Sequence, residues 1–373
     1  MIPLLLLLCL QGNIARIIEK RQVFQRGPDH EQFKWPNNTV HYYFDDNLFD
    51  PSMSEAVLRA MELISTHTCI KFSTEPSDVM IRMESDPTQN FCYAEIGHVR
   101  PHQKFSFVSA CYSSGAAAHE LIHSLGFIHT HQRSDRDQYL DFKMNLEDMT
   151  PDMRDQYMIY EGQTLYVPYD YGSVMHYPDE SGNYYPIEKN IRMTDTMGTE
   201  MLAFYDYLMI NKYYECSCDT DLKCQNNGYP NPANCSQCNC PYGYGGDDCS
   251  RRAEPGQTVM ATLEPQTVTI KLDAGFRNGD ERQVDFIYSY LWIEAPANKS
   301  IVTRIELVSK EKCVTGCSRG GLEIKINDDD RLTSRRFCCG TGQFDRSFHS
   351  PTIVMAYNSV GLDEYIIHYR HDP

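Results

Sequence analysis

The pattern of apolar and polar positions predicts a first part of the chain that mixes helices with strands. Residues 40–44 read as an extended segment. The sequence Asp50-Pro51-Ser52 then precedes apolar residues at helical spacing, and Pro is favoured in the first turn of a helix. The apolar stripe of this predicted helix consists of Ala56, Val57, Ala60, Met61 and Ile64.

Four further short segments read as strands, and a second helix follows much later. The predicted strands are residues 69–73, 79–83, 92–99 and 105–110. The predicted helix covers residues 201–214, with Leu202, Tyr205, Leu208 and Met209 on one apolar side.

From about Thr258 the pattern changes to short alternating strands separated by turn residues. These predicted strands are residues 268–272, 286–293, 300–310, 321–326, 352–357 and 365–369. Strands at such spacing are typical of a β-sandwich. The chain is therefore expected to be α+β in its first part and all-β in its last part.

The chain opens with an apolar run over residues 1–10 that is too short to cross a bilayer. We interpret residues 1–15 as a signal peptide, although positive charge is missing from its start. The Lys20-Arg21 pair reads either as a processing site after a short pro-segment, residues 16–21, or as two solvated basic residues. No later apolar run is long enough for a membrane helix, so we expect a secreted, extracellular protein.

Charge and cysteine content agree with export and exclude some partners. The chain carries 51 acidic and 34 basic side chains, a net charge of −17, which argues against nucleic acid or an anionic membrane as partner. Of its 15 cysteines, Cys9 lies in the leader, and the even number that remains is best read as disulfides. Asn-x-Ser/Thr sequences predict glycosylation at Asn37, Asn234 and Asn298.

The stretch that begins at His119 reads His-Glu-Leu-Ile-His-Ser-Leu-Gly-Phe-Ile-His-Thr-His. On a helix, His119 and His123 point from one face, one turn apart. Gly126 lets the helix end and the chain turn, which brings His129 in from another direction. Three neutral imidazoles leave a fourth position of a zinc ion open, as catalytic sites require, and Glu120 is placed to reach a water there. We therefore predict one catalytic zinc ion per subunit.

The length of this motif gives it its specificity. His-Glu-x-x-His alone occurs by chance in roughly one chain in twenty of this length. The addition of Gly126 and His129 lowers that frequency to about one in ten thousand. Downstream, the sequence Ser-Val-Met-His-Tyr places Met175 where a tight turn under the imidazoles would give them a polarizable apolar floor.

The long zinc motif, the Asp-Arg-Asp sequence at 135–137 and the Ser-Val-Met-His-Tyr turn closely resemble the astacin family of metzincin metalloproteases. The resemblance covers roughly residues 35–216. It implies a two-lobed protease domain, residues 22–216, with the zinc helix at the cleft. It also implies that substrate lies along an edge strand around residues 92–95, as an added strand.

The resemblance also assigns roles to individual residues. It implies zinc ligands at His119, His123 and His129, a general base and acid at Glu120, the turn methionine at Met175, and a displaceable zinc ligand at Tyr177 that stabilises the oxyanion. It further implies two disulfides, Cys69–Cys216 and Cys92–Cys111. These roles fit peptide hydrolysis, since zinc activates water and polarises a carbonyl, a carboxylate moves the proton, and a phenol donates to developing negative charge.

Two positions depart from the family. Astacins commonly carry a Glu after the third histidine, which receives the new N-terminal ammonium when a zymogen is processed; here Thr130 stands there and cannot form that ion pair. The residues that border it, 133–137, read mainly as a structural ion-pair network. In the stretch 197–201, where a basic group often selects acidic substrate residues, Glu200 would repel them.

Two further modules are expected after the protease domain. Residues 217–250 hold six cysteines and end with Cys240, an aromatic-Gly sequence and Cys249, which resembles an EGF-like module with these two cysteines paired. Six cysteines admit fifteen pairings, and a zinc knuckle is the competing interpretation. Residues 258–371 resemble a CUB domain. Their cysteines depart from the usual pattern; pairings of Cys313 and Cys317 with the adjacent Cys338 and Cys339 are plausible.

The sequence therefore predicts a secreted zinc metalloendopeptidase whose EGF-like and CUB-like modules dock protein substrates or extracellular matrix. The alternative is a secreted binding or matrix-interaction protein with a catalytically silent protease domain. A purely structural zinc protein is disfavoured because no fourth strong ligand is evident.

Overall fold

The computed structural model of this protein describes residues 33–160, 165–179, 182, 184–187, 193–275, 283–307, 313–339, 343–347 and 350–373. The predicted signal peptide, residues 1–15, and pro-segment, residues 16–21, lie outside the described residues, as does the end of the strand expected at 300–310. Within the described ranges, no helix is both long and apolar enough to cross a membrane.

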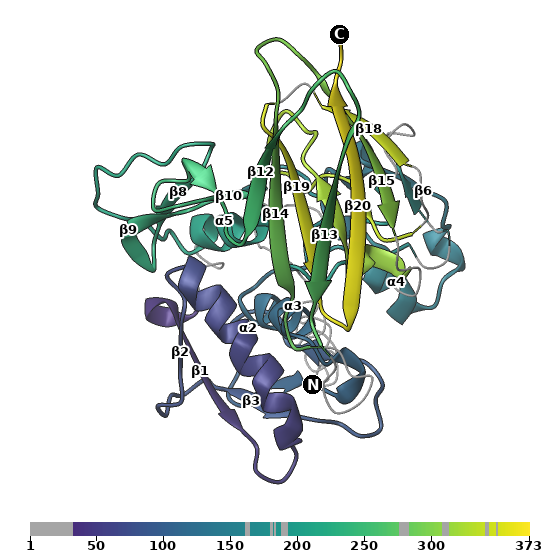
Figure 1. Ribbon diagram of the computed structural model, residues 1–373. Helices are drawn as coiled ribbons and strands as arrows, with labels where there is room; N and C mark the ends of the chain where they lie inside the picture. The colour runs from purple at the N-terminus through teal and green to yellow at the C-terminus, as the bar shows by residue number, and fades with distance from the viewer. Residues whose placement is uncertain are drawn as a thin grey trace, which may run out of the picture.

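The first part of the chain contains a five-stranded sheet with two helices packed on it (Figure 1). Its strands are β1 (Thr39–Phe44), β2 (Lys71–Ser73), β3 (Ile81–Glu84), β4 (Tyr93–Ala94) and β5 (Gln103–Ser106), in the order β2-β1-β3-β5-β4. All neighbours are parallel except β4, which runs antiparallel along one edge. The two helices are α2 (Ser54–His67) and α3 (Ser114–Ser124).

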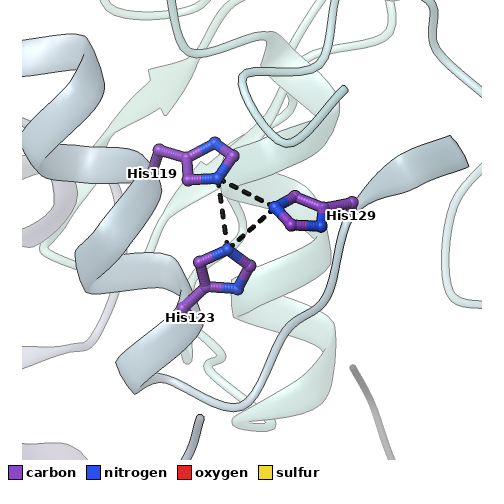
Figure 2. A group of neighbouring side chains, drawn as sticks. All are labelled: His119, His123 and His129. Atoms are coloured by element: carbon purple, nitrogen blue, oxygen red, sulfur yellow. Dashed lines mark hydrogen bonds between the residues drawn. The ribbon is translucent and has the colours of Figure 1, made fainter. Parts of the chain in front are cut away.

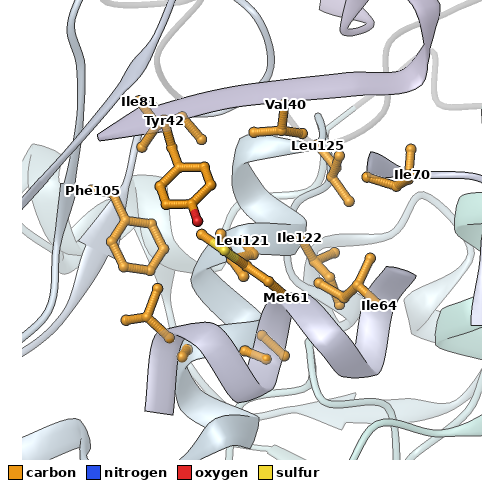
Figure 3. Packing of buried hydrophobic residues seen from close by; sticks show 14 of the residues in the cluster. Val40, Tyr42, Met61, Ile64, Ile70, Ile81, Phe105, Leu121, Ile122 and Leu125 are labelled. Carbon is orange, nitrogen blue, oxygen red and sulfur yellow. The ribbon is translucent and has the colours of Figure 1, made fainter. Parts of the chain in front are cut away.

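Apolar side chains of the sheet and of both helices meet in one core (Figure 3). Val40 and Tyr42 of β1 are two residues apart and face the same side, as alternation in a strand requires. All residues of the stripe predicted for α2 are buried. This core fixes α3, because Leu121 and Ile122 of that helix belong to it. The helix that carries His119 and His123 is thus anchored in this core.

The edge strand is shorter than the sequence predicts. The extended segment expected over residues 92–99 is a strand only at β4. The chain leaves the sheet at Gly97, which has a φ of +76° and donates its N–H to the carbonyl of His123 at 3.0 Å. The segment therefore serves two purposes, since it closes the sheet and then contacts the end of α3.

Besides short 3-10 helices, the described residues between α3 and residue 216 form two short strands and two helices. These are β6 (Leu140–Phe142), β7 (Tyr184–Pro186), α4 (Pro151–Tyr157) and α5 (Phe204–Tyr213). Tyr205, Leu208 and Met209 of α5 lie in one apolar cluster, as predicted, but the helix also buries residues outside that cluster. Leu208 and Met209 are only half-buried, whereas Asp206 and Asn211 are buried. Both polar side chains are buried because they hydrogen-bond to distant backbone, Asp206 to the N–H of Val174 and Asn211 to the carbonyl of His67.

A small cysteine-rich region and a β-sandwich complete the described chain (Figure 1). The small region contains β8 (Tyr229–Asn231), β9 (Asn234–Asn239), β10 (Tyr244–Gly245) and β11 (Arg251–Arg252). One sheet of the sandwich has the order β12-β14-β19-β16-β17 and the other β13-β20-β15-β18. The strands are β12 (Gly256–Met260), β13 (Gln266–Asp273), β14 (Ile287–Glu294), β15 (Ile301–Leu307), β16 (Gly320–Ile324), β17 (Arg336–Phe337), β18 (Gln343–Ser347), β19 (Thr352–Asn358) and β20 (Leu362–His371).

The cysteines of the described residues are joined in seven disulfides: Cys69–Cys216, Cys92–Cys111, Cys218–Cys235, Cys224–Cys238, Cys240–Cys249, Cys313–Cys339 and Cys317–Cys338. In the small region these bonds occupy every sulfur. Zinc binding there would need free thiolates, so the zinc-knuckle interpretation is wrong.

Candidate metal centre

The helix α3 begins and ends where the chain can satisfy its backbone. The Ser113 hydroxyl accepts a hydrogen bond from the N–H of Ala116 and caps its start. At the other end, Gly126 takes a φ of +103° and donates its N–H to the carbonyl of His123 at 2.8 Å. Only glycine adopts this conformation without strain. The turn carries the chain away from the helix axis toward His129.

Three histidine nitrogens meet at one point (Figure 2). His119 and His123 project from successive turns of α3, and His129 approaches from the following segment. Their Nε2 atoms are 3.1 Å apart for His119 and His123, 3.1 Å for His123 and His129, and 3.2 Å for His119 and His129. No other group of three or more potential metal ligands occurs among the described residues.

The other nitrogen of each ring is held by an oxygen acceptor. Nδ1 of His119 lies 2.7 Å from the carbonyl of Val174, and Nδ1 of His123 lies 2.6 Å from that of Phe127. Nδ1 of His129 lies 3.1 Å from the side-chain oxygen of Gln132. Each contact favours a proton on Nδ1 and leaves the Nε2 lone pair directed at the common point.

This geometry fits a zinc ion. Tetrahedral zinc bonded to imidazoles at about 2.0–2.1 Å keeps their nitrogens about 3.3 Å apart, close to the separations found here. Burial, together with the neighbouring His119, lowers the pKa of His123 to about 3, and burial lowers that of His129 well below its usual value. The rings are therefore neutral at physiological pH, the form that binds metal.

Glu120 lies between the metal ligands and the edge strand. Its carboxylate is buried and accepts a hydrogen bond from the backbone of Ala94 in β4, while Oε2 has no hydrogen-bond partner. Burial raises the pKa of this carboxyl to about 8, with the Ala94 hydrogen bond acting in the opposite direction. Glu120 also lines a pocket together with His119 and Tyr177. A buried, incompletely bonded carboxylate beside a metal centre is suited to proton transfer.

Tyr177 packs over the third ligand. Its ring centroid lies 4.0 Å from that of His129 and 4.5 Å from that of His131. The phenol donates a hydrogen bond to the side-chain oxygen of Gln156 in α4 at 3.1 Å. Burial raises the pKa of Tyr177 above its usual value, so the hydroxyl keeps its proton and acts as a donor.

The turn under the histidines is fixed by Asp206 of α5. Met175 is buried there, and its carbonyl accepts the N–H of Thr130 at 2.8 Å. The Thr130 hydroxyl donates to that of Ser173 at 3.1 Å, and Ser173 donates to Asp206 at 2.6 Å. Asp206 also accepts the N–H of Val174. The hydroxyl of Thr130, the residue that departs from the family, therefore has an internal hydrogen-bond partner that is itself bonded to a buried carboxylate.

The charged run after the third histidine is more buried than a solvated ion-pair network. Arg133 makes two 2.9 Å hydrogen bonds to Asp135, as expected. Arg136, however, is almost fully buried, with its guanidinium 3.8 Å from the ring centroid of Phe142 and bonded to the carbonyl of His131. Arg136 also pairs with Asp137 at 3.3 Å, so it joins the predicted ion-pair network while it contacts backbone and aromatic groups.

Comparison with known proteins identifies this combination of motif and geometry. Residues 28–215 match the peptidase family described as Astacin, and this match is about half of the chain. The chain belongs to the astacin family. The astacin segment covers the sheet, both helices, the histidine cluster and α5. The whole unit that positions the metal centre is therefore shared with the family.

Relatives of this astacin carry names that agree with a zinc site. It is 63% identical over 337 residues to zinc metalloproteinase nas-22 of Caenorhabditis elegans, covering 88% of this chain and 92% of the relative. It is 45% identical over 350 residues to zinc metalloproteinase-like protein nas-21 of the same organism, covering 90% and 85%. A hatching-enzyme zinc protease of medaka fish, high choriolytic enzyme 1, is 27% identical and covers 52% of this chain and 96% of that one, with a TM-score of 0.43. This astacin is thus a zinc metalloproteinase.

The structure also places residues that the sequence left aside. Glu200 lines the pocket that contains His119 and Glu120. Gln156 accepts a hydrogen bond from Tyr177, and Asp206 accepts one from Ser173 in the turn, although neither acceptor belongs to a motif. No local pattern marks them, because their partners are distant in sequence.

Proposed function

We propose that this astacin is a secreted endopeptidase in which His119, His123 and His129 hold zinc and Glu120 moves the proton. The convergence of three neutral imidazoles beside a buried carboxylate carries the proposal. A zinc ion in that position supplies Lewis acidity, which polarises the scissile carbonyl and lowers the pKa of a water. The protein itself would have to accept the proton of the attacking water and stabilise the negative charge on the carbonyl oxygen.

In this mechanism, Glu120 takes the proton of the attacking water and later delivers it to the leaving amine. Its hydrogen bond from Ala94 fixes one carboxylate oxygen and leaves Oε2 for the water. The same Ala94 belongs to the edge strand β4, along which we propose that substrate binds as an added strand. Base and substrate backbone would therefore be positioned by one segment.

Tyr177 is proposed to donate its hydroxyl to the oxyanion. Tyr177→Phe keeps the ring packed against His129 and removes only that donor, so kcat should fall about 100-fold, as for loss of one oxyanion donor, with zinc content and KM little changed. Steady-state kinetics on a peptide substrate would measure this. Tyr171→Phe is the matched control, since that phenol binds the carbonyl of Tyr139 outside the pocket. An unchanged kcat would exclude the role.

We further propose that residues 217–250 and 258–371 are EGF-like and CUB-like modules that bind protein substrates or extracellular matrix. The disulfides and the all-β sandwich support this assignment. Export is supported by the same disulfides and by the exposure of Asn37, Asn234 and Asn298, which leaves each available for glycosylation. The mature chain would begin near residue 22 after removal of a pro-segment.

Hydrolysis of casein or gelatin by the purified protein tests the proposal. We expect hydrolysis that a chelator stops and added zinc restores, together with about one zinc ion per chain. The alternative, a silent binding protein, predicts bound zinc without hydrolysis. Internal cleavage products would establish an endopeptidase, whereas release of terminal residues alone would contradict it.

A further inference from the structure

We propose that the C-terminal sandwich holds one wall of the pocket beside the zinc ligands and thereby sets which substrate side chain the pocket accepts, with Arg336 as the positioning residue. The wall segment is residues 196–201, which lie shortly before α5 and include residues that line the pocket. This inference rests on the proposed peptidase function. It assigns a specificity role to a residue far outside the protease motifs.

The pocket lies between the zinc helix and the wall segment. His119 and Glu120 line it on the side of α3, and Gly198, Thr199 and Glu200 line it on the other side. Its volume is about 180 Å³. Sites for whole small ligands span about 300–1,000 Å³, so this pocket has room for one part of a substrate, such as a side chain.

Arg336 makes three contacts with the wall segment from strand β17. Its guanidinium donates to the hydroxyl of Thr199, and its backbone N–H donates to the hydroxyl of Thr196 at 3.0 Å. A second guanidinium nitrogen lies 3.5 Å from the sulfur of Met201. Arg336 is 1% exposed, so water does not compete for these contacts. The wall segment is therefore bonded directly to the sandwich.

Arg336 is itself fixed within the sandwich. Its Nε donates to Glu323 of β16 at 3.0 Å, and the ammonium of Lys325 lies 2.8 Å from the same carboxylate. Both Glu323 and Lys325 are buried. A planar guanidinium bonded to a buried carboxylate has few alternative orientations. The position of the Thr199 hydroxyl is thus set by β16 and β17.

Backbone packing transmits the same constraint toward Tyr177. A Cβ on Gly316 of the sandwich would lie 2.1 Å from the carbonyl oxygen of Gly198, so the two chains are already in close contact. On its other side, a Cβ on Gly198 would lie 2.4 Å from Pro178, the residue after Tyr177. The wall segment is therefore confined between the sandwich and the turn that carries the phenol.

The sandwich also reaches the opposite side of the pocket. The carbonyl of Val284 accepts the N–H of Ser114, the first residue of α3, at 2.8 Å. Next to it, Asp285 pairs with Arg59 of α2 at 2.9 Å. Both borders of the pocket thus contact strands of the sandwich or the segments that join them, which is the kind of support that a specificity-setting site requires.

Two substitutions at Thr199 test this inference against a matched control. Thr199→Val removes the acceptor of the Arg336 guanidinium and of the Met201 N–H without changing side-chain shape, and Thr199→Ser retains both contacts. Thr333→Val removes a similar buried hydroxyl that joins the sandwich to Asp170 away from the pocket. Peptide libraries varied at each position around the scissile bond would measure relative kcat/KM. We expect Thr199→Val to reduce selectivity about three- to tenfold at one position only, and the other two variants to retain wild-type selectivity.

Hydrogen exchange supplies a readout that does not depend on activity. Amides of residues 196–200 should exchange faster in Thr199→Val than in the wild type or Thr199→Ser, with α5 unchanged. The amide of Met201 is left out of this comparison because it donates to the Thr199 hydroxyl itself. A uniform loss of rate on all peptides, or equal effects of Thr199→Val and Thr333→Val, would overturn the inference. If the wild-type protein hydrolyses no peptide, the proposed function fails, and exchange alone decides whether Arg336 holds the wall.

Discussion

Replacement of Glu120 by Gln is expected to lower kcat about 100- to 10,000-fold, the range typical for loss of a general base, while zinc stays bound. The amide has the shape of the carboxylate and can still accept the Ala94 N–H, but it cannot take a proton from water. The three imidazoles keep their contacts, because none of their Nδ1 partners is Glu120. Kinetics on a fluorogenic peptide and zinc analysis of the same sample measure both parts.

The control for this substitution is Glu62→Gln, which neutralises an exposed carboxylate on α2. It should leave kcat and zinc content unchanged. A Glu120→Gln protein that retains more than about a hundredth of the wild-type rate would show that another group moves the proton, because a general base contributes at least about 100-fold. Loss of zinc in that variant would instead assign Glu120 a structural role.

The largest expected effect on stability is that of Asp206→Ala. This carboxylate accepts hydrogen bonds from Ser173, from the N–H of Val174 and from the N–H of Ala203, at 2.6, 2.9 and 2.7 Å. Their loss leaves buried donors unsatisfied and should cost about 3 kcal/mol or more in unfolding free energy. For a domain of this size, that corresponds to a fall in Tm of roughly 6–12 °C. Calorimetry would measure it; an unchanged Tm would contradict it.

The same carboxyl makes a prediction about pH. Burial raises the pKa of Asp206 from 3.8 to about 7. Since the folded state favours the protonated form, the stability from this group is complete below the unfolded pKa and is lost as the pH rises through 7. Asp206→Asn cannot titrate. The Tm advantage of the wild type over Asp206→Asn should therefore be larger near pH 5 than near pH 8. The opposite trend would refute the assignment.

The sequence predicts the metal centre well because its signals are local. Spacing along one helix and one turn places His119, His123 and His129, and these residues meet in the structure. Alternation likewise indicates the sandwich, since buried residues alternate with more exposed ones along β13 and β20. Helix α2 is predicted for the same reason. Elements whose pattern lies within a few turns or one strand can be read directly.

Residues with distant partners could not be predicted. Asp206 stands in a helix where a charge normally faces solvent, and its burial depends on Ser173, 33 residues earlier in the chain. Arg336 and Thr199 are separated by 137 residues, and nothing near either residue signals the other. Thr130 reads as a lost ion-pair partner in the sequence, whereas the structure gives its hydroxyl an internal partner.

The close contact between Gly316 and Gly198 limits how this chain can recombine with its relatives. Modules that evolve by exchange usually join through linkers and tolerate new neighbours. Here, a sandwich taken from another protein would collide with the protease backbone if it carried any side chain at position 316. Chimeras that combine this protease with another C-terminal region would therefore need a glycine at that contact. Substitutions on the two sides of this contact would therefore have to evolve together.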